Sequence, residues 1–225
     1  VLAALKMWAN VCEASRLVHF TTKSKGKSGI PQRAHFILST YQTYSGKQPP
    51  TESVNQVLKA WAYSNEHLRG SMAEQVFQQY LLSKPGREAG TPSPDGDTFR
   101  QMIRAWCWSK ETRCAFTATG YLMRMMRLME AGQPDMEPTL DDYHTLFQAW
   151  TTAEDKNAPS KVHSVLQLAD NAYRRGQTKI RLDSDCYRFA LQAMGRRVNV
   201  PEVGDLIDKT LLEMKRDRMI IPNTE

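Results

Sequence analysis

Residues 143–150 read YHTLFQAW, and residues 99–106 read FRQMIRAW. In both octapeptides an aromatic residue is followed, three, four and seven places later, by two apolar residues and a tryptophan. Side chains at these spacings lie on one face of an α-helix, because an α-helix has about 3.6 residues per turn. Each octapeptide therefore predicts an amphipathic helix whose buried face ends at Trp106 or at Trp150.

The same pattern recurs along the chain at a nearly fixed interval. Trp61, Trp106 and Trp150 are separated by 45 and 44 residues, and Met194 follows after another 44. A fixed interval of this kind indicates a helical repeat. The apolar stripes are Val54, Val57, Leu58 and Trp61; Phe99, Met102, Ile103 and Trp106; Tyr143, Leu146, Phe147 and Trp150; Tyr187, Ala190, Leu191 and Met194; and, in a partial first copy, Val1, Ala4, Leu5 and Trp8.

A second stripe with the same spacing predicts a second helix in each copy. Its members are Ala34, Ile37, Leu38 and Tyr41; Ala73, Val76, Phe77 and Tyr80; Ala118, Tyr121, Leu122 and Met125; Val162, Val165, Leu166 and Ala169; and, where the register is ambiguous, Ile207, Thr210, Leu211 and Met214.

Ser71 with Glu74 is expected to form a capping box, Ser160 to cap a helix, and Pro201 to occupy a first helical turn. Pro49, Pro94, Pro138 and Pro222 separate the copies, with Leu182 at the remaining boundary.

A single helical hairpin is too small to bury its apolar faces, whereas stacked hairpins bury them against their neighbours. The sequence therefore predicts an all-α fold, an α-solenoid of antiparallel helical hairpins. We expect one array over residues 1–225, divided into 1–48 (partial, with a long insertion), 49–93, 94–137, 138–181 and 182–221, with another copy starting at 222. Residues 9–33 and 84–93 are expected to be loop insertions.

Composition excludes several other classes of protein. The chain has 225 residues, 30 Lys and Arg against 24 Asp and Glu, and 41% hydrophobic residues, which is a globular composition. It has no apolar run of about 18 residues, so no membrane span is expected. Four cysteines without a CxxC pair are expected to be reduced thiols. Because Val1 lies within a helical pattern, we expect a fragment of a longer protein, in which any targeting peptide would lie upstream of Val1.

The repeat resembles the pentatricopeptide-repeat family, particularly the divergent repeats of organellar proteins and of protein-only RNase P. The residues that carry the resemblance are the first helices (FRQMIRAW, YHTLFQAW, YRFALQAM), a second helix that begins with alanine (AEQVFQQY), and the inter-copy prolines of PDGDTF and PTLDDY. The units here are longer than the family's standard unit, and the extra residues fall in loops, where insertions cost little. The resemblance implies single-stranded RNA as partner, a mitochondrion or plastid as location, and a role in transcript processing, stability or translation.

The resemblance also implies that the first helix of each copy lines an RNA-binding groove. Residues one and five places after the start of each first stripe are expected to face away from the core. They are Lys6, Asn55, Lys59, Arg100, Arg104, His144, Gln148, Arg188 and Gln192. Cations and amides of this kind bind phosphates and base edges. Two places before each aromatic, where the family has an apolar residue, this chain has Glu52, Asp97, Asp141 and Asp185, which we expect to complement helix starts.

In the family, a base is read by the residue after the aromatic together with the residue after the proline that ends the same copy. The corresponding pairs here are Asn55 with Asp95, Arg100 with Thr139, His144 with Asp183, and Arg188 with Asn223. Only the first is a combination that the family associates with uracil. We therefore expect a preference for uracil at one position and little sequence reading elsewhere.

No catalytic motif is recognisable in the chain. It has no HxE with a later CxxC, no Walker loop, no GxGxxG and no nucleophile elbow, and its histidines show no metal-ligand spacing. We therefore expect no catalysis, cofactor, metal site or small-molecule substrate. Two alternatives to an RNA-binding module remain open: a scaffold that binds proteins, as tetratricopeptide arrays do, and the repeat arm of a longer nuclease.

Overall fold

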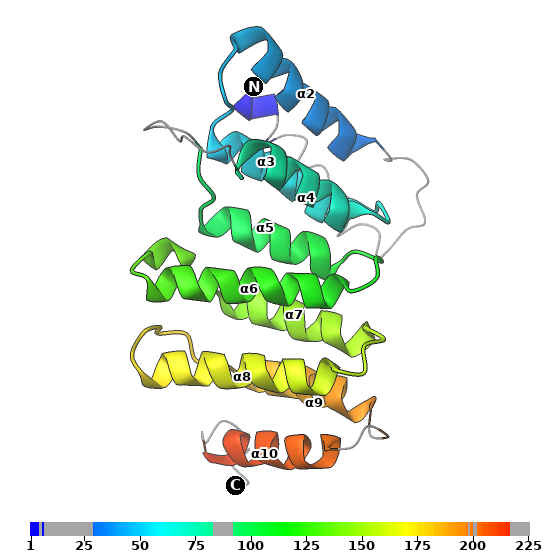
Figure 1. Cartoon of the computed structure of the whole chain (residues 1–225), viewed down its shortest axis with the longest axis vertical. Helices are drawn as coiled ribbons and strands as arrows, with labels where there is room; N and C mark the ends of the chain where they lie inside the picture. The colour runs from blue at the N-terminus through cyan, green and yellow to red at the C-terminus, as the bar shows by residue number, and fades with distance from the viewer. Residues whose placement is uncertain (5, 7–28, 83–91, 198, 200–201, 217–225) are drawn as a thin grey trace, which may run out of the picture. The chain divides into compact units, whose positions relative to one another are not determined.

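The structure is a computed structural model that describes residues 1–4, 6, 29–82, 92–197, 199 and 202–216. These residues form α-helices and one 3-10 turn, and they include no strand, which confirms the predicted all-α class (Figure 1). None of the described helices is long and apolar enough to cross a membrane. The helices are α2 (Ile30–Ser45), α3 (Thr51–Ala62), α4 (Arg69–Tyr80), α5 (Gly96–Cys107), α6 (Cys114–Glu130), η1 (Pro134–Met136), α7 (Leu140–Thr152), α8 (Ala158–Arg174), α9 (Ser184–Gly195) and α10 (Val203–Arg216).

The chain divides into two compact units, Val1–Cys114 (unit 1) and Ala115–Glu225 (unit 2). In unit 1, helix α3 packs against α2, α4 and α5, and α4 also packs against α5. In unit 2, helix α9 packs against α7, α8 and α10, and α8 also packs against α10. Within each unit, helices of one copy therefore pack against helices of the next. A single array over the whole chain stays a prediction.

The predicted first-helix stripes form the cores of these units. Trp61, Trp106 and Trp150 are only 1%, 9% and 0% exposed. Every other member of the stripes in α3, α5 and α7 is also buried, as are Tyr187, Ala190 and Met194 of α9, whereas Leu191 is half-buried. Leu5 and Trp8 of the partial copy lie outside the described residues. The period of the sequence thus identified the core-facing side of these helices.

The second stripes are buried less completely than the first. Ala73, Val76, Phe77 and Tyr80 are fully buried in α4, and the stripe of α8 is buried as well. In α10 the predicted register holds in part: Thr210 is buried, while Ile207, Leu211 and Met214 are half-buried. The other half-buried members are Ile37 and Tyr41 of α2 and Tyr121 of α6.

Two of the repeat tryptophans make equivalent hydrogen bonds to the second helix of the preceding copy. In unit 1, Trp106 Nε1 donates to Glu74 Oε2 of α4 at 3.2 Å. In unit 2, Trp150 Nε1 donates to Thr119 Oγ1 of α6 at 3.0 Å. Glu74 and Thr119 occupy matching places, each directly after the alanine that starts its stripe. Trp106 and Trp150 therefore hold adjacent copies together at equivalent positions, as their spacing predicts.

The residues after the inter-copy boundaries start the first helices. Asp95 caps α5 by accepting from Thr98 N, and Thr139 caps α7 through a capping box with Asp142. Asp183 caps α9 by accepting from Cys186 N at 3.0 Å. Each cap satisfies a backbone N–H that has no partner within its helix. The inter-copy boundary is thus also the point where the next helix begins.

The predicted capping roles of Ser71 and Ser160 are wrong. Helix α4 begins at Arg69, before Ser71, and helix α8 begins at Ala158, with proline rather than Ser160 in its first positions. Ser71 donates its backbone N–H to Glu111 Oε1 at 2.9 Å, and its hydroxyl donates to the other oxygen of the same carboxylate. The Glu111 carboxylate of the next copy therefore takes the place of the predicted Glu74 partner. The spacing of residues within one helix could not predict this contact. The predicted roles of Pro201 and Pro222, and most of the two loop insertions, lie outside the described residues. Residues 30–33, predicted to belong to the first insertion, instead form the first turn of α2.

The Glu111 carboxylate makes a pH-dependent contribution to stability. Burial alone would raise its pKa, but hydrogen bonds from Ser109, Ser71 and the Gly70 backbone hold the pKa below its ordinary value of 4.5. Because the folded-state pKa is the lower one, this stabilisation is complete above pH 4.5 and is lost as pH falls through the folded-state value.

We expect Glu111→Gln to lower the free energy of unfolding by about 1 kcal/mol or less at pH 7, because the carboxylate is only half-buried. Urea titrations between pH 7 and pH 3 should show the difference from the wild type shrinking in acid. Glu130→Gln, at an exposed position in α6, is the control. A difference that stays constant with pH would show that the Glu111 charge does not contribute.

Candidate nucleic-acid interface

The predicted RNA-binding residues differ widely in their exposure. Lys6, Gln148, Arg188 and Gln192 are exposed, whereas Lys59, Asp95, Arg100, Arg104, His144 and Asp183 are half-buried. Asn55 is only 3% exposed, so the prediction that it faces away from the core is wrong. Its amide is buried because it bridges two residues of the next copy.

Asn55 links α3 to the start of α5. Its Nδ2 donates to the Asp95 carboxylate oxygens at 3.0 and 3.2 Å, and its Oδ1 accepts from Thr98 Oγ1 at 2.7 Å. Asp95 also accepts from the backbone N–H of Thr98 at 2.8 Å. Asn55, Asp95 and Thr98 thus form a closed hydrogen-bonded cluster, which we call the unit 1 triplet.

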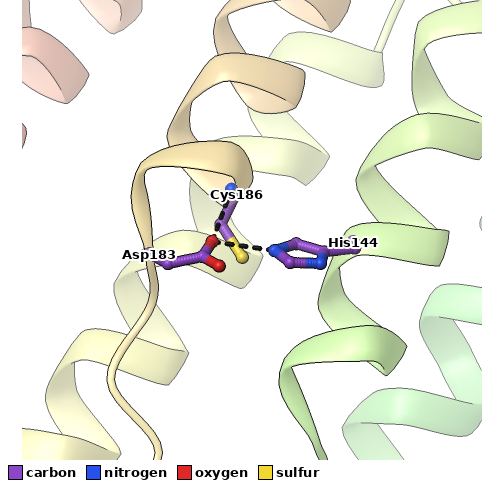
Figure 2. Close-up of side chains that lie close together, drawn as sticks. All are labelled: His144, Asp183 and Cys186. Carbon is purple, nitrogen blue, oxygen red and sulfur yellow. Dashed lines mark hydrogen bonds and ion pairs between the residues drawn. The ribbon is translucent and has the colours of Figure 1, made fainter.

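An equivalent cluster links α7 to the start of α9. His144 Nε2 lies 2.8 Å from Asp183 Oδ1, which also accepts from Cys186 N, as Figure 2 shows. His144, Asp183 and Cys186 occupy the same places in their copies as Asn55, Asp95 and Thr98, and we call them the unit 2 triplet. The partial exposure of the His144 and Asp183 side chains, 28% and 36%, leaves them accessible to solvent.

Two of the four predicted pairs therefore meet in space, Asn55 with Asp95 and His144 with Asp183. Arg100 and Thr139 belong to different units, and Asn223, the predicted partner of Arg188, lies outside the described residues. The contacts confirm that the two pairs are neighbours. Their role in reading bases stays a prediction.

The unit 2 triplet contains an ionised carboxylate, that of Asp183. Burial alone would raise the pKa of Asp183, but the hydrogen bonds from His144 and Cys186 hold it below its ordinary value. Burial, followed by the charge of Asp183, raises the pKa of the Cys186 thiol. At neutral pH an ionised carboxylate therefore lies beside a protonated thiol and an imidazole.

Acidic residues at the helix starts neutralise part of the predicted basic stripe. Lys6 Nζ lies 2.7 Å from Glu52 Oε1, and Arg188 Nη2 lies 3.0 Å from Asp185 Oδ1. All four side chains are about half exposed. Exposed ion pairs of this kind contribute little free energy, so a phosphate can compete for the cations. The positive potential is nevertheless smaller than the column of cations in the sequence suggests.

The sequence did not single out Thr98 and Cys186, the third members of the triplets. Both are the third residue of a helix, where a side chain and a backbone N–H face the N-cap residue. Their spacing of three residues from Asp95 and Asp183, which is that of a capping box, could have identified them in the sequence.

A hollow of about 580 Å³ lies between α9 and α10, and no pattern in the sequence predicted it. It is lined by Ser184, Asp185, Arg188, Leu191, Gln192 and Met214. Two of these, Arg188 and Gln192, belong to the predicted stripe, so this part of the stripe borders a partly apolar depression.

No protein-family model matches the chain, and no curated protein sequence matches it. Function is therefore inferred from the residues and their geometry.

Proposed function

We propose that the chain is a segment of an α-solenoid that binds single-stranded RNA and does not itself catalyse a reaction. By its resemblance to pentatricopeptide repeats, it would act in the processing, stability or translation of transcripts in a mitochondrion or plastid. The observation that carries the proposal is the contact of Asn55 with Asp95 and of His144 with Asp183. These are the residues that the resemblance pairs, and they meet at the same place in two separate copies.

The predicted stripe supports RNA as the partner through its polar residues in each unit. In unit 1, Lys59, Arg100 and Arg104 offer half-buried cations, and in unit 2, Gln148 and Gln192 offer exposed amides. Guanidinium groups bind phosphate oxygens, and amides donate to and accept from base edges. Because Asn55 is buried, it is better placed to orient Asp95 than to contact a base by itself.

Binding of single-stranded RNA at a series of salt concentrations tests the proposal. We expect the logarithm of affinity to fall linearly with the logarithm of salt concentration, because bound phosphates release counterions. Replacing Arg100, Arg104 and Arg188 together with alanine should reduce the slope by about 0.7 for each phosphate that the variant no longer binds. Fluorescence anisotropy of a labelled oligonucleotide measures both quantities.

The control variant replaces Arg127, Lys161 and Arg175 with alanine. All three are exposed on second helices or just after one, so this variant loses the same charge from positions outside the predicted stripe. The proposal requires the two variants to differ in slope. Equal slopes would show that binding depends on net charge alone, and no binding at low salt would reject RNA as the partner.

A protein-interaction scaffold is the second candidate, and the hollow between α9 and α10 favours it. Leu191 and Met214 lie in its lining beside Asp185 and Arg188, which suits an apolar side chain of a peptide with a polar neighbour. A scaffold would leave RNA affinity unchanged when Arg100, Arg104 and Arg188 are replaced. The same titrations therefore separate the two candidates.

A further inference from the structure

The unit 2 triplet brings together three side chains that are all potential metal ligands. One ligand atom each from His144, Asp183 and Cys186 lies within 4.8 Å of the other two, and Figure 2 shows the three groups converging on one point. His144 belongs to α7, whereas Asp183 and Cys186 are the N-cap and third residue of α9. Because α7 and α9 pack directly against each other, two rigid elements position the three ligand atoms.

The types of ligand suit a divalent ion of intermediate softness. Zn²⁺ binds imidazole nitrogen, thiolate sulfur and carboxylate oxygen, and it often combines three protein ligands with one water molecule. A neutral imidazole, a thiolate and a carboxylate together carry two negative charges, which the ion would neutralise. Mg²⁺ and Ca²⁺ prefer oxygen ligands, so they fit the triplet less well.

The distances are compatible with a tetrahedral site after small side-chain movements. Bonds of about 2.0 to 2.3 Å to zinc place neighbouring ligand atoms about 3.3 to 3.8 Å apart. The 2.8 Å contact between His144 and Asp183 would have to lengthen, and the widest separation, at most 4.8 Å, would have to shorten by about 1 Å. The site therefore requires side-chain rotation to supply these shifts.

Access to the site is open on one side. The side chains of His144 and Asp183 are 28% and 36% exposed, whereas Cys186 is fully buried. An ion can therefore enter from solvent and keep a water ligand on that side. Arg188, two residues after Cys186, is paired with Asp185, so its charge is already partly neutralised.

The unit 1 triplet shows the same position without an imidazole and a thiol. There the imidazole is replaced by the Asn55 amide and the thiol by the Thr98 hydroxyl, and hydrogen bonds close the cluster. The cap from Asp95 to Thr98 matches the cap from Asp183 to Cys186. Helix capping therefore requires neither histidine nor cysteine here, although both occur in unit 2.

We infer that His144, Asp183 and Cys186 form a binding site for one Zn²⁺ ion with water as the fourth ligand. On binding, the Cys186 thiol releases its proton to solvent and a sulfur–zinc bond forms. The Nε2 proton that His144 donates to Asp183 passes to solvent, and Nδ1 carries the single proton of the neutral imidazole, taken up from solvent if it was not already there. Nε2 of His144 and the carboxylate of Asp183 then each form one bond to the ion. The inference does not rest on the proposed RNA function, although His144 and Asp183 belong to both sites.

The experiment compares the full metal-free chain with the double variant His144→Asn/Cys186→Thr, which gives unit 2 the triplet of unit 1. Calorimetric titration with Zn²⁺ should show about one equivalent bound to the wild type. Loss of outer-sphere partners alone weakens metal binding about 10- to 100-fold, so loss of two direct ligands should weaken it by about 100-fold or more. Titration with Co²⁺ should produce a thiolate-to-metal charge-transfer band that Cys186→Ser abolishes.

Several results would overturn the inference. They are equal zinc affinity in the wild type and the double variant, no saturable binding by the wild type, or a cobalt complex without the thiolate band. Circular dichroism checks that the double variant is folded. If it is not, the single variants His144→Gln and Cys186→Ser give the same comparison, since each removes one ligand and should weaken binding.

Discussion

Replacing Trp106 with alanine is expected to lower the free energy of unfolding of unit 1 by about 3 to 5 kcal/mol. The indole is 9% exposed, and its Nε1 donates to Glu74 of α4. Alanine would leave a cavity between α4 and α5 and would leave Glu74 without this donor. Urea denaturation followed by circular dichroism measures the loss.

Trp108→Ala is the matched control. Trp108 directly follows α5 as its C-cap residue, is half-buried and contacts Tyr63 edge-on at 5.2 Å between ring centroids. Because less of its surface is buried, its loss should cost clearly less than the loss of Trp106. If Trp106→Ala cost less than about 1 kcal/mol, the stripe would have been assigned to the wrong face of α5.

The second large effect is expected at Gly70, where α4 approaches α5 most tightly among the described glycines. A Cβ atom there would lie 2.6 Å from Cε3 and 2.8 Å from Cδ2 of Trp106, and 3.0 Å from Oε1 of Glu111. The indole is held in the core and cannot move aside easily. We therefore expect Gly70→Ala to lower the free energy of unfolding by about 1 to 3 kcal/mol, although alanine favours helices.

Gly120→Ala separates the steric effect from helix propensity. Gly120 is exposed within α6, and a Cβ atom there would have no neighbour within 4 Å. Its replacement should stabilise unit 2 by about 0.5 to 1 kcal/mol. If both variants were stabilised, the close contact of Gly70 with Trp106 would be absent in solution.

The sequence predicted the class of fold and most of the core because the spacing of its apolar residues matches the turn of an α-helix. A stripe such as Val54, Val57, Leu58 and Trp61 can be buried on one side only if the segment is helical, and the structure buries all four residues. The arrangement of the copies into one array cannot be predicted from this spacing. It depends on how the two units pack, and local spacing does not determine that.

The site was predicted in part, and the errors have a common cause. His144 and Asp183, which their repeat positions pair, are in contact, whereas Asn55 was expected to face outward and is buried. Its burial results from partners 40 and 43 residues away, Asp95 and Thr98. The Ser71 cap failed for the same reason, because its partner Glu111 is 40 residues away. The spacing of apolar residues within one helix does not predict contacts between residues of different copies.

The aspartates that start α5 and α9 each serve two helices at once. Asp183 holds the first turn of α9 through Cys186 and also holds His144 of α7, and Asp95 does the same for α5 and α3. Nucleating a helix is the unfavourable step in its formation. Where one carboxylate both nucleates a helix and attaches it to the preceding copy, initiation and docking become one event. Within each unit, an already formed copy can therefore offer the next helix its starting point.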